Sequence, residues 1–203
     1  MATKRARILE TAEREFLRHG FDGTSIDAIV DHVGGSKSTV YAHFRDKSIL
    51  FAEALAGIRR EIDFSLTNFR QGVWPWTQES LVLLTIELIN VQYHERALHL
   101  LRVVISESER FPEVARQYYD EGFVALVSQT SEFLAECRDS GAQFIGTASA
   151  AGELLLSLTR GPEEMRIILG LDPPPDPARS VVRAESIVAR FADLVRWEDA
   201  PPG

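Results

Sequence analysis

The chain has 203 residues, of which 45% are hydrophobic and 26% are charged, a composition typical of an ordinary globular protein. Cys137 is the only cysteine, which excludes a disulfide within the chain. The charged N-terminus has no apolar segment behind it that would make a signal peptide, and no uncharged apolar run approaches the roughly 18 residues of a membrane span. These features predict a cytoplasmic protein.

The net charge of −8 is unevenly distributed along the chain. Residues 1–50 carry eight Lys and Arg against seven Asp and Glu, whereas residues 51–203 carry fourteen against twenty-three. A locally basic end on an acidic body suits binding to a polyanion through that end alone, because the acidic body lowers non-specific attraction.

The first predicted helix covers residues 3–19. Ile8, Ala12 and Phe16 recur at helical spacing and form its buried stripe. Gly20 ends the helix, and Phe21 packs back against it. These apolar residues are expected to belong to a core.

Two shorter helices are predicted on either side of a glycine pair. Thr24 and Ser25 are residue types that start helices, and a first-turn carboxylate at Asp27 adds capping. Gly34 and Gly35 then break the helix and allow a sharp turn. The pattern is that of a helix-turn-helix unit.

The third helix follows Ser36 and buries Val40 and Phe44, which leaves a polar face of donors and one aromatic ring. Such a face suits a helix inserted in the DNA major groove. Base edges are the expected targets of Lys37 and Thr39. Phosphates or the thymine methyl edge are expected for Tyr41 and His43, which could instead pack or face solvent. The remaining candidates for DNA contact here are Thr24, Ser25, Ser36, Ser38 and Lys47.

The rest of the chain predicts further helices over residues 46–70, 79–93, 95–109, 112–138, 148–159 and a last one carrying Val181 to Val195. Breaks are expected around Pro75, at the Gly161–Pro162 pair and in the proline-rich stretch 172–177. The fold class is therefore all-α, with about nine helices.

No metal, cofactor or enzymatic activity is predicted. His94 and His99 lie five residues apart, whereas the HExxH zinc motif needs a spacing of four on one helical face. The sequence has no nucleophile elbow, P-loop or dinucleotide loop.

From about residue 6 to 55 the chain resembles the DNA-binding domain of the TetR family of bacterial transcriptional regulators. The resemblance rests on ILETAEREFLRHGFDGTS, VGGSKSTVY and YAHFRDKSIL. Residues 102–122 resemble the C-terminal domain of the AcrR-like branch more loosely. Asp27, where the family is often basic or polar, and Gly35, where it is usually apolar, depart from the pattern.

The resemblance implies a DNA-binding domain at residues 1–47 and a ligand-binding and dimerisation domain at residues 48–203. It implies a homodimeric regulator, most often a repressor, that leaves a palindromic operator when a small molecule binds. It also implies that a basic arm with Lys4 and Arg5 can touch DNA, although a solvated tail is the alternative. A helical ligand- or partner-binding dimer that has lost DNA binding is the alternative function, suggested by Asp27 and Gly35.

Candidate ligand contacts are large or polar residues near the expected pocket: Trp74, Glu87, Tyr118, Tyr119 and Phe123. Each could instead belong to the core, or face a solvent seam in the case of Glu87. In the resembling family the last two long helices form a four-helix dimer interface, and packing within the subunit is the alternative. The residues assigned to that interface are Leu154, Leu155, Leu158, Val181, Ala184, Val188, Phe191 and Val195. Cys137 is either an inert small residue or a redox sensor.

Overall fold

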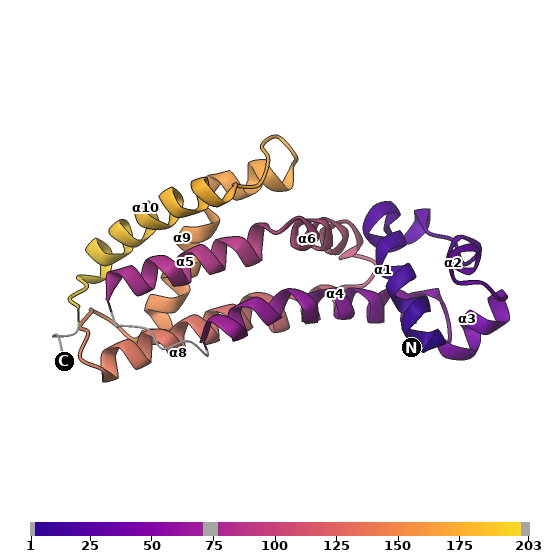
Figure 1. Cartoon of the computed structure of the whole chain (residues 1–203), viewed down its shortest axis with the longest axis horizontal. Coiled ribbons are helices and arrows are strands. Elements are labelled where there is room, and N and C mark those ends of the chain that lie inside the picture. The colour runs from indigo at the N-terminus through magenta and orange to yellow at the C-terminus, as the bar shows by residue number, and fades with distance from the viewer. Residues whose placement is uncertain (1–2, 71–76, 200–203) are drawn as a thin grey trace. The chain divides into compact units, whose positions relative to one another are not determined.

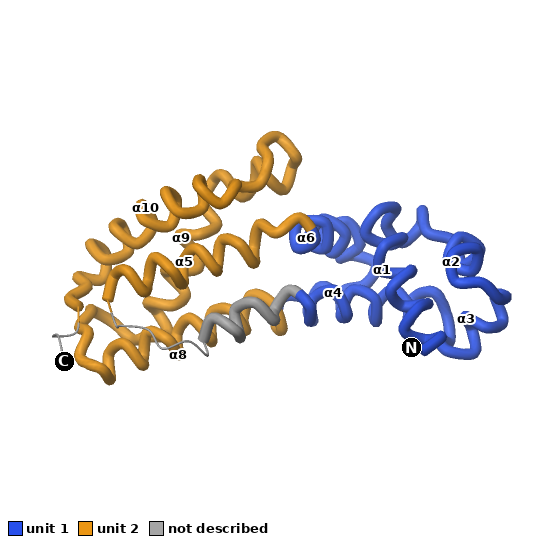
Figure 2. Tube along the Cα trace, viewed as in Figure 1, with its two compact units in different colours: residues 1–62, 96–119 blue, residues 63–95, 120–203 orange. Residues whose placement is uncertain are grey.

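The computed structural model of the chain describes residues 3–70 and 77–199, and of residues 62–70 it describes the backbone alone. Every regular element in those ranges is helical, apart from one isolated bridge between Gln143 and Glu198 (Figure 1). The all-α prediction is confirmed. The chain divides into two compact units, residues 1–62 with 96–119, and residues 63–95 with 120–203 (Figure 2).

The first unit contains α1 (Lys4–Gly23), α2 (Ile26–Val33), α3 (Lys37–His43), the start of α4 (Lys47–Arg70), α6 (Glu95–Glu107) and α7 (Pro112–Tyr118). The helix starts follow from local capping. The Thr3 hydroxyl accepts from the Ala6 N–H, and the Asp46 carboxylate accepts from the Ile49 N–H at 2.9 Å. Gly20 interrupts α1 with a φ of +67°, so the predicted break lies where the sequence placed it.

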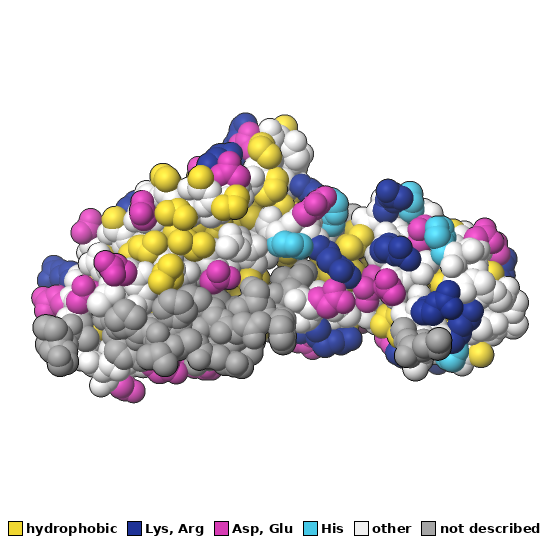
Figure 3. All heavy atoms as spheres, viewed as in Figure 1, with side chains coloured by type: hydrophobic (Ala, Val, Ile, Leu, Met, Phe, Trp, Pro, Cys, Tyr) yellow, Lys and Arg dark blue, Asp and Glu magenta, His cyan; other side chains and the backbone are white. Residues whose placement is uncertain are grey.

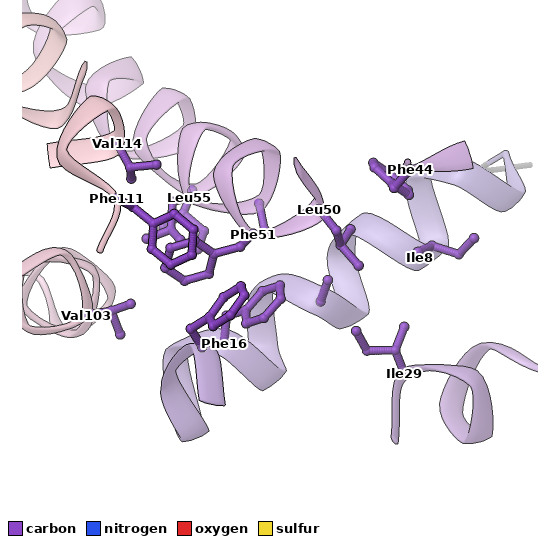
Figure 4. Close-up of a cluster of buried hydrophobic side chains, with 14 of the residues drawn as sticks. Ile8, Phe16, Ile29, Phe44, Leu50, Phe51, Leu55, Val103, Phe111 and Val114 are labelled. Atoms are coloured by element: carbon purple, nitrogen blue, oxygen red, sulfur yellow. The ribbon is translucent and has the colours of Figure 1, made fainter. Parts of the chain in front are cut away.

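Aromatic rings fill the core of this unit (Figure 4). The Phe51 ring packs edge-on against Phe16, with ring centres 5.0 Å apart, and against Phe21 at 5.2 Å. Phe111, just before α7, lies 4.8 Å from Phe21 and 5.0 Å from Phe51. Because Phe111 comes from the α6–α7 connection, residues 96–119 share one core with the helix-turn-helix segment. The structural units therefore do not divide at residue 47.

The second unit contains α5 (Gln78–Tyr93), α8 (Ala125–Asp139), α9 (Ala148–Ile168) and α10 (Pro177–Val195). In this unit α8 packs on α9, and α10 packs on both α5 and α9. The single helix predicted over residues 112–138 is divided into α7, a π-helical segment at Tyr119–Val124, and α8. No helix in the described part of the chain is both long and apolar enough to cross a membrane.

A kink in α9 is stabilised by polar groups from two other helices. Gly161 adopts a φ of +51° and Pro162 follows it, so carbonyl groups of the preceding turn lose their helical partners. The Tyr93 hydroxyl donates to the Thr159 and Arg160 carbonyls at 3.0 and 3.1 Å. The Arg183 guanidinium also donates to the Thr159 carbonyl at 2.8 Å. Burial raises the pKa of Tyr93 to about 12, so the hydroxyl remains a donor at neutral pH.

Candidate nucleic-acid interface

The turn between α2 and α3 depends on its two glycines. Gly34 has a φ of +73° and Gly35 a φ of +113°, both in the left-handed region that side chains disfavour. The Lys4 ammonium donates to the Val33 carbonyl at 3.0 Å and to the Gly34 carbonyl at 2.6 Å. The N-terminal arm is thereby attached to the turn. Two of the three donors of the Lys4 ammonium thus stabilise the end of α2, and the DNA contact expected of Lys4 stays a prediction.

The short α3 presents the polar face that the sequence predicted. Val40 and Phe44 are 3% and 1% exposed and anchor the helix to the core. Tyr41 is 45% exposed, and the exposed or half-exposed donors beside it are Ser36, Lys37, Ser38, Thr39 and His43. The Ser36 hydroxyl lies 2.7 Å from that of Ser38 and 3.3 Å from that of Thr39. This hydroxyl cluster can donate to or accept from a base edge or a phosphate.

Lys37 is held by an acidic residue of the neighbouring helix. Its ammonium lies 2.9 Å from the Asp27 carboxylate, and both side chains are exposed. The hydrogen bond to Asp27, and then its charge, raise the pKa of Lys37 above the ordinary value. The cap of α2 is made by Ser25, whose hydroxyl accepts from the Ala28 N–H at 3.0 Å. Asp27, expected from the sequence to add capping to the helix, is instead the ion-pair partner of Lys37. This pair was not predicted from the sequence.

Thr24 does not belong to the exposed surface. It is 1% exposed, and its hydroxyl donates to the Gly20 carbonyl at 2.9 Å. The Thr24 side chain is therefore not free to contact a phosphate, and the contact expected through the backbone N–H groups at the start of α2 stays a prediction. Ser25, one residue later, is exposed and stays a candidate.

Two further basic residues on this unit are partly occupied by contacts within the chain. Arg5 pairs with Glu53 of α4, and its guanidinium lies 4.7 Å from the centre of the Phe44 ring. The Lys47 ammonium lies 4.4 Å above the Phe21 ring, at the start of α4. Lys, Arg and His side chains are prominent on the visible face of the end that carries α1 to α3 (Figure 3).

The predicted ligand contacts have different surroundings in the structure, and their role stays a prediction. Tyr118 lines a small cavity in the first unit with residues of α4, α6 and α7. Glu87 and Phe123 are half-buried, and Tyr119 is 55% exposed. The Arg160 guanidinium lies 4.7 Å from the Phe123 ring. Trp74 lies outside the described residues.

Burial divides the residues assigned to a dimer interface into two groups. Five of them are at most 5% exposed within the single chain and fill the core of the second unit: Leu155, Ala184, Val188, Phe191 and Val195. These five residues therefore pack within the subunit, which the sequence had left open as the alternative to a dimer interface. Leu154 and Leu158 are half-exposed, and Val181 is 39% exposed. These three remain available to a partner.

A surface groove of about 910 Å³ separates the second half of α9 from α10. Its apolar lining includes Leu158, Pro162 and Val182, and its charged lining includes Arg179 and Arg190. Val182 is 67% exposed and Leu194, further along α10, is 63% exposed. Figure 3 shows hydrophobic side chains gathered over α5 and α10.

Two other candidate sites have little chemical support. Among the described residues, no group of three or more His, Cys, Asp and Glu could hold a metal ion. Cys137 is 1% exposed, and burial, followed by the charge of Glu136, raises the pKa of its thiol to about 12. The thiol is therefore protonated at neutral pH, whereas redox sensors need an accessible thiolate.

The fold and the α2–turn–α3 unit place the chain in the helix-turn-helix class of transcriptional regulators. Residues 8–54 match the family of bacterial regulatory proteins, tetR family, and residues 79–194 match the AefR-like transcriptional repressor, C-terminal domain. The chain belongs to the TetR family.

Individual relatives agree with this assignment. The HTH-type transcriptional repressor SCO4008 of Streptomyces coelicolor is 31% identical over 110 residues, which are 54% of this chain and 52% of that protein. The chain spans about half the length, or less, of the curated relatives that it matches. A putative TetR-family regulator from Mesorhizobium loti superposes with a TM-score of 0.80 at 26% identity, covering 94% of this chain and 96% of the other. The Flavonoid-responsive Regulator FrrA gives 0.72 at 28% identity, with the same coverages.

Proposed function

We propose that the chain is a homodimeric, sequence-specific DNA-binding repressor that a small molecule releases from its operator. The observation that carries the proposal is the polar face of α3. Exposed donors project from a short helix whose opposite face, Val40 and Phe44, is buried at 3% and 1% exposure in the hydrophobic core of the first unit. Donors held in this way can read base edges in a major groove. The protein would act in the cytoplasm, with the DNA it binds.

The dimer proposal rests on the exposed apolar face of α9 and α10. Val182 and Leu158 line the groove between these helices, and Leu194 and Val181 extend the exposed apolar surface along α10. A two-fold dimer would place the two α3 helices in major grooves about 34–36 Å apart, or a multiple of that distance.

Val182→Glu tests this surface by light scattering coupled to gel filtration. The variant should elute as a monomer at concentrations at which the unmodified chain is a dimer. Ile105→Glu, a similar change at an exposed residue of α6, is the matched control and should leave the dimer intact. A dimeric Val182→Glu variant would exclude this face.

The effector proposal is an apolar or amphipathic small molecule. The apolar helices of the second unit and the name of the similar regulator FrrA, which describes that protein as flavonoid-responsive, support it. The molecule would shift the population toward a state whose two α3 helices are wrongly spaced. That shift is limited by its difference in affinity between the two states.

Selection of bound duplexes from a random pool, at two salt concentrations, tests the proposal as a whole. The expected result is a palindrome with half-sites one helical turn, or a multiple, apart. Lys37→Ala should then relax base preference, whereas Lys47→Ala should weaken all duplexes about equally and reduce the salt slope by about one. Failure to enrich any duplex would favour the alternative, a dimer that binds a ligand or partner without DNA.

A further inference from the structure

An acidic residue, Asp27, lies beside the polar face of α3 that is proposed to bind DNA. A carboxylate at this place repels DNA phosphates. Asp27 lies in the first turn of α2, and its side chain is 64% exposed. Its carboxylate is not needed for the helix cap, because Ser25 accepts the hydrogen bond from the Ala28 N–H. The carboxylate instead lies 2.9 Å from the ammonium of Lys37, the first residue of α3.

This ion pair orders the Lys37 side chain before DNA binds, and so lowers the conformational entropy that the side chain loses on binding. A free lysine side chain has many rotamers and binds any phosphate within reach as a flexible point charge. Tethered to Asp27 through one donor, the ammonium keeps two further donors, enough to contact the acceptors of a guanine edge. A side chain ordered before binding loses less conformational entropy on binding.

The same ion pair disfavours non-specific binding to DNA phosphates. A phosphate contact that draws Lys37 away from Asp27 breaks this ion pair and leaves the carboxylate facing the negative DNA backbone without its partner. A complex in which Lys37 contacts a base edge from its tethered position avoids both penalties. Discrimination thus arises from a repulsive element against the wrong complex.

We propose that Asp27 is a specificity-determining residue of the DNA interface, which positions the Lys37 ammonium toward a base edge and disfavours sequence-independent phosphate binding. The inference rests on the proposed function and adds to it a positioning role that the helix-turn-helix pattern does not contain.

The test is a set of fluorescence-anisotropy titrations on two duplexes of equal length, the selected operator and an unrelated sequence, at several salt concentrations. Asp27→Asn should bind the unrelated duplex about two- to fivefold more tightly, the size expected of one exposed ion pair, with a salt slope steeper by about one. Operator affinity should rise less or fall, so that the ratio of the two affinities decreases. Asp27→Glu should retain most of the ratio.

Asp31→Asn is the matched control, since Asp31 is exposed on the same helix and forms no ion pair with another described residue. It changes net charge equally and should affect both duplexes alike. In a Lys37→Ala background, Asp27→Asn should no longer change the ratio.

Two results would overturn the inference while leaving the proposed function intact. One is an Asp27→Asn variant that shifts both affinities equally, as Asp31→Asn does. The other is an effect on the ratio that persists without Lys37. If the unmodified chain prefers no duplex, the proposed function fails, and this inference fails with it.

Discussion

An ion-paired triad in the first unit gives the sharpest stability prediction. Glu13 of α1 is 6% exposed, and its carboxylate lies 2.8 Å from the Arg96 guanidinium of α6. Arg96 also lies 2.8 Å from the Glu61 carboxylate of α4. Gly57 makes room for this arrangement, because a Cβ atom there would lie 2.6 Å from the Glu13 carboxylate. One arginine therefore joins three helices.

The charge on Glu13 is a net cost to folding at neutral pH. Burial, and then the charge of Glu61, raise the pKa of Glu13, whereas Arg96 lowers it. A carboxyl group whose folded pKa lies above its unfolded value stabilises the fold below the unfolded pKa. This contribution is lost as the pH rises through the folded pKa. Arg96 limits that loss.

Arg96→Met keeps the length of the side chain and removes its charge. Breaking a buried ion pair typically costs about 3–5 kcal/mol. The side chains of Arg96 and Glu61 are 37% and 59% exposed, so solvent screens part of the effect. We expect the free energy of unfolding at pH 7 to fall by about 2 kcal/mol, and the melting temperature by roughly 4–8 °C.

Urea unfolding followed by circular dichroism at pH 7 and pH 5 measures this effect. The difference from the unmodified chain should be smaller at pH 5, where Glu13 is more protonated. Adding Glu13→Gln to Arg96→Met should recover more than half of the loss. Arg116→Met, at an exposed arginine of α7, is the control and should change stability by less than about 0.5 kcal/mol. Equal stability of Arg96→Met and the unmodified chain, or no recovery in the double variant, would refute the reasoning.

Three further predictions concern the turn, the kink in α9 and the buried thiol. Gly34→Ala should lower the free energy of unfolding by about 1 kcal/mol, because its φ of +73° disfavours a side chain even though the space is open. Gly122→Ala, where the space is also open but φ is not positive, should not destabilise, and equal losses in both variants would contradict the strain argument. Tyr93→Phe should cost about 1 kcal/mol in urea unfolding, since it removes donation to the Thr159 and Arg160 carbonyls; an unchanged midpoint would mean that Arg183 alone satisfies them. Cys137 should resist a thiol-specific reagent at pH 8 in the folded protein and react fully in denaturant, and rapid reaction of the folded chain would disprove its burial.

The fold could be predicted largely from local signals. Apolar residues at helical spacing, such as Ile8, Ala12 and Phe16, are buried at 0% exposure as expected. The Gly34–Gly35 turn and the Gly161–Pro162 interruption lie where the sequence placed them. Each of these features depends on residues within a few positions of one another, so the chain itself contains the information.

The partners of polar residues were harder to predict. The ammonium of Lys4 binds carbonyls 29 and 30 residues away, and Arg96 binds a carboxylate 83 residues away. No local pattern indicates such pairs, because they form only when distant helices pack. The Asp27–Lys37 pair was missed for another reason: it depends on the angle that the Gly34–Gly35 turn sets between two consecutive helices, and the spacing of residues does not give that angle.

The last helix separates what the sequence determined from what the tertiary structure decided. The spacing of Ala184, Val188 and Phe191 established that one face of α10 is buried, since such a stripe is unstable in water. The spacing did not establish what covers that face. Either a helix of this chain or a helix of a second copy could remove the same apolar surface from water. In the structure, α10 packs on α5 and α9, so helices of the same chain cover its apolar face. Only then does the outer face, with Val182 and Leu194, become the surface available to a partner.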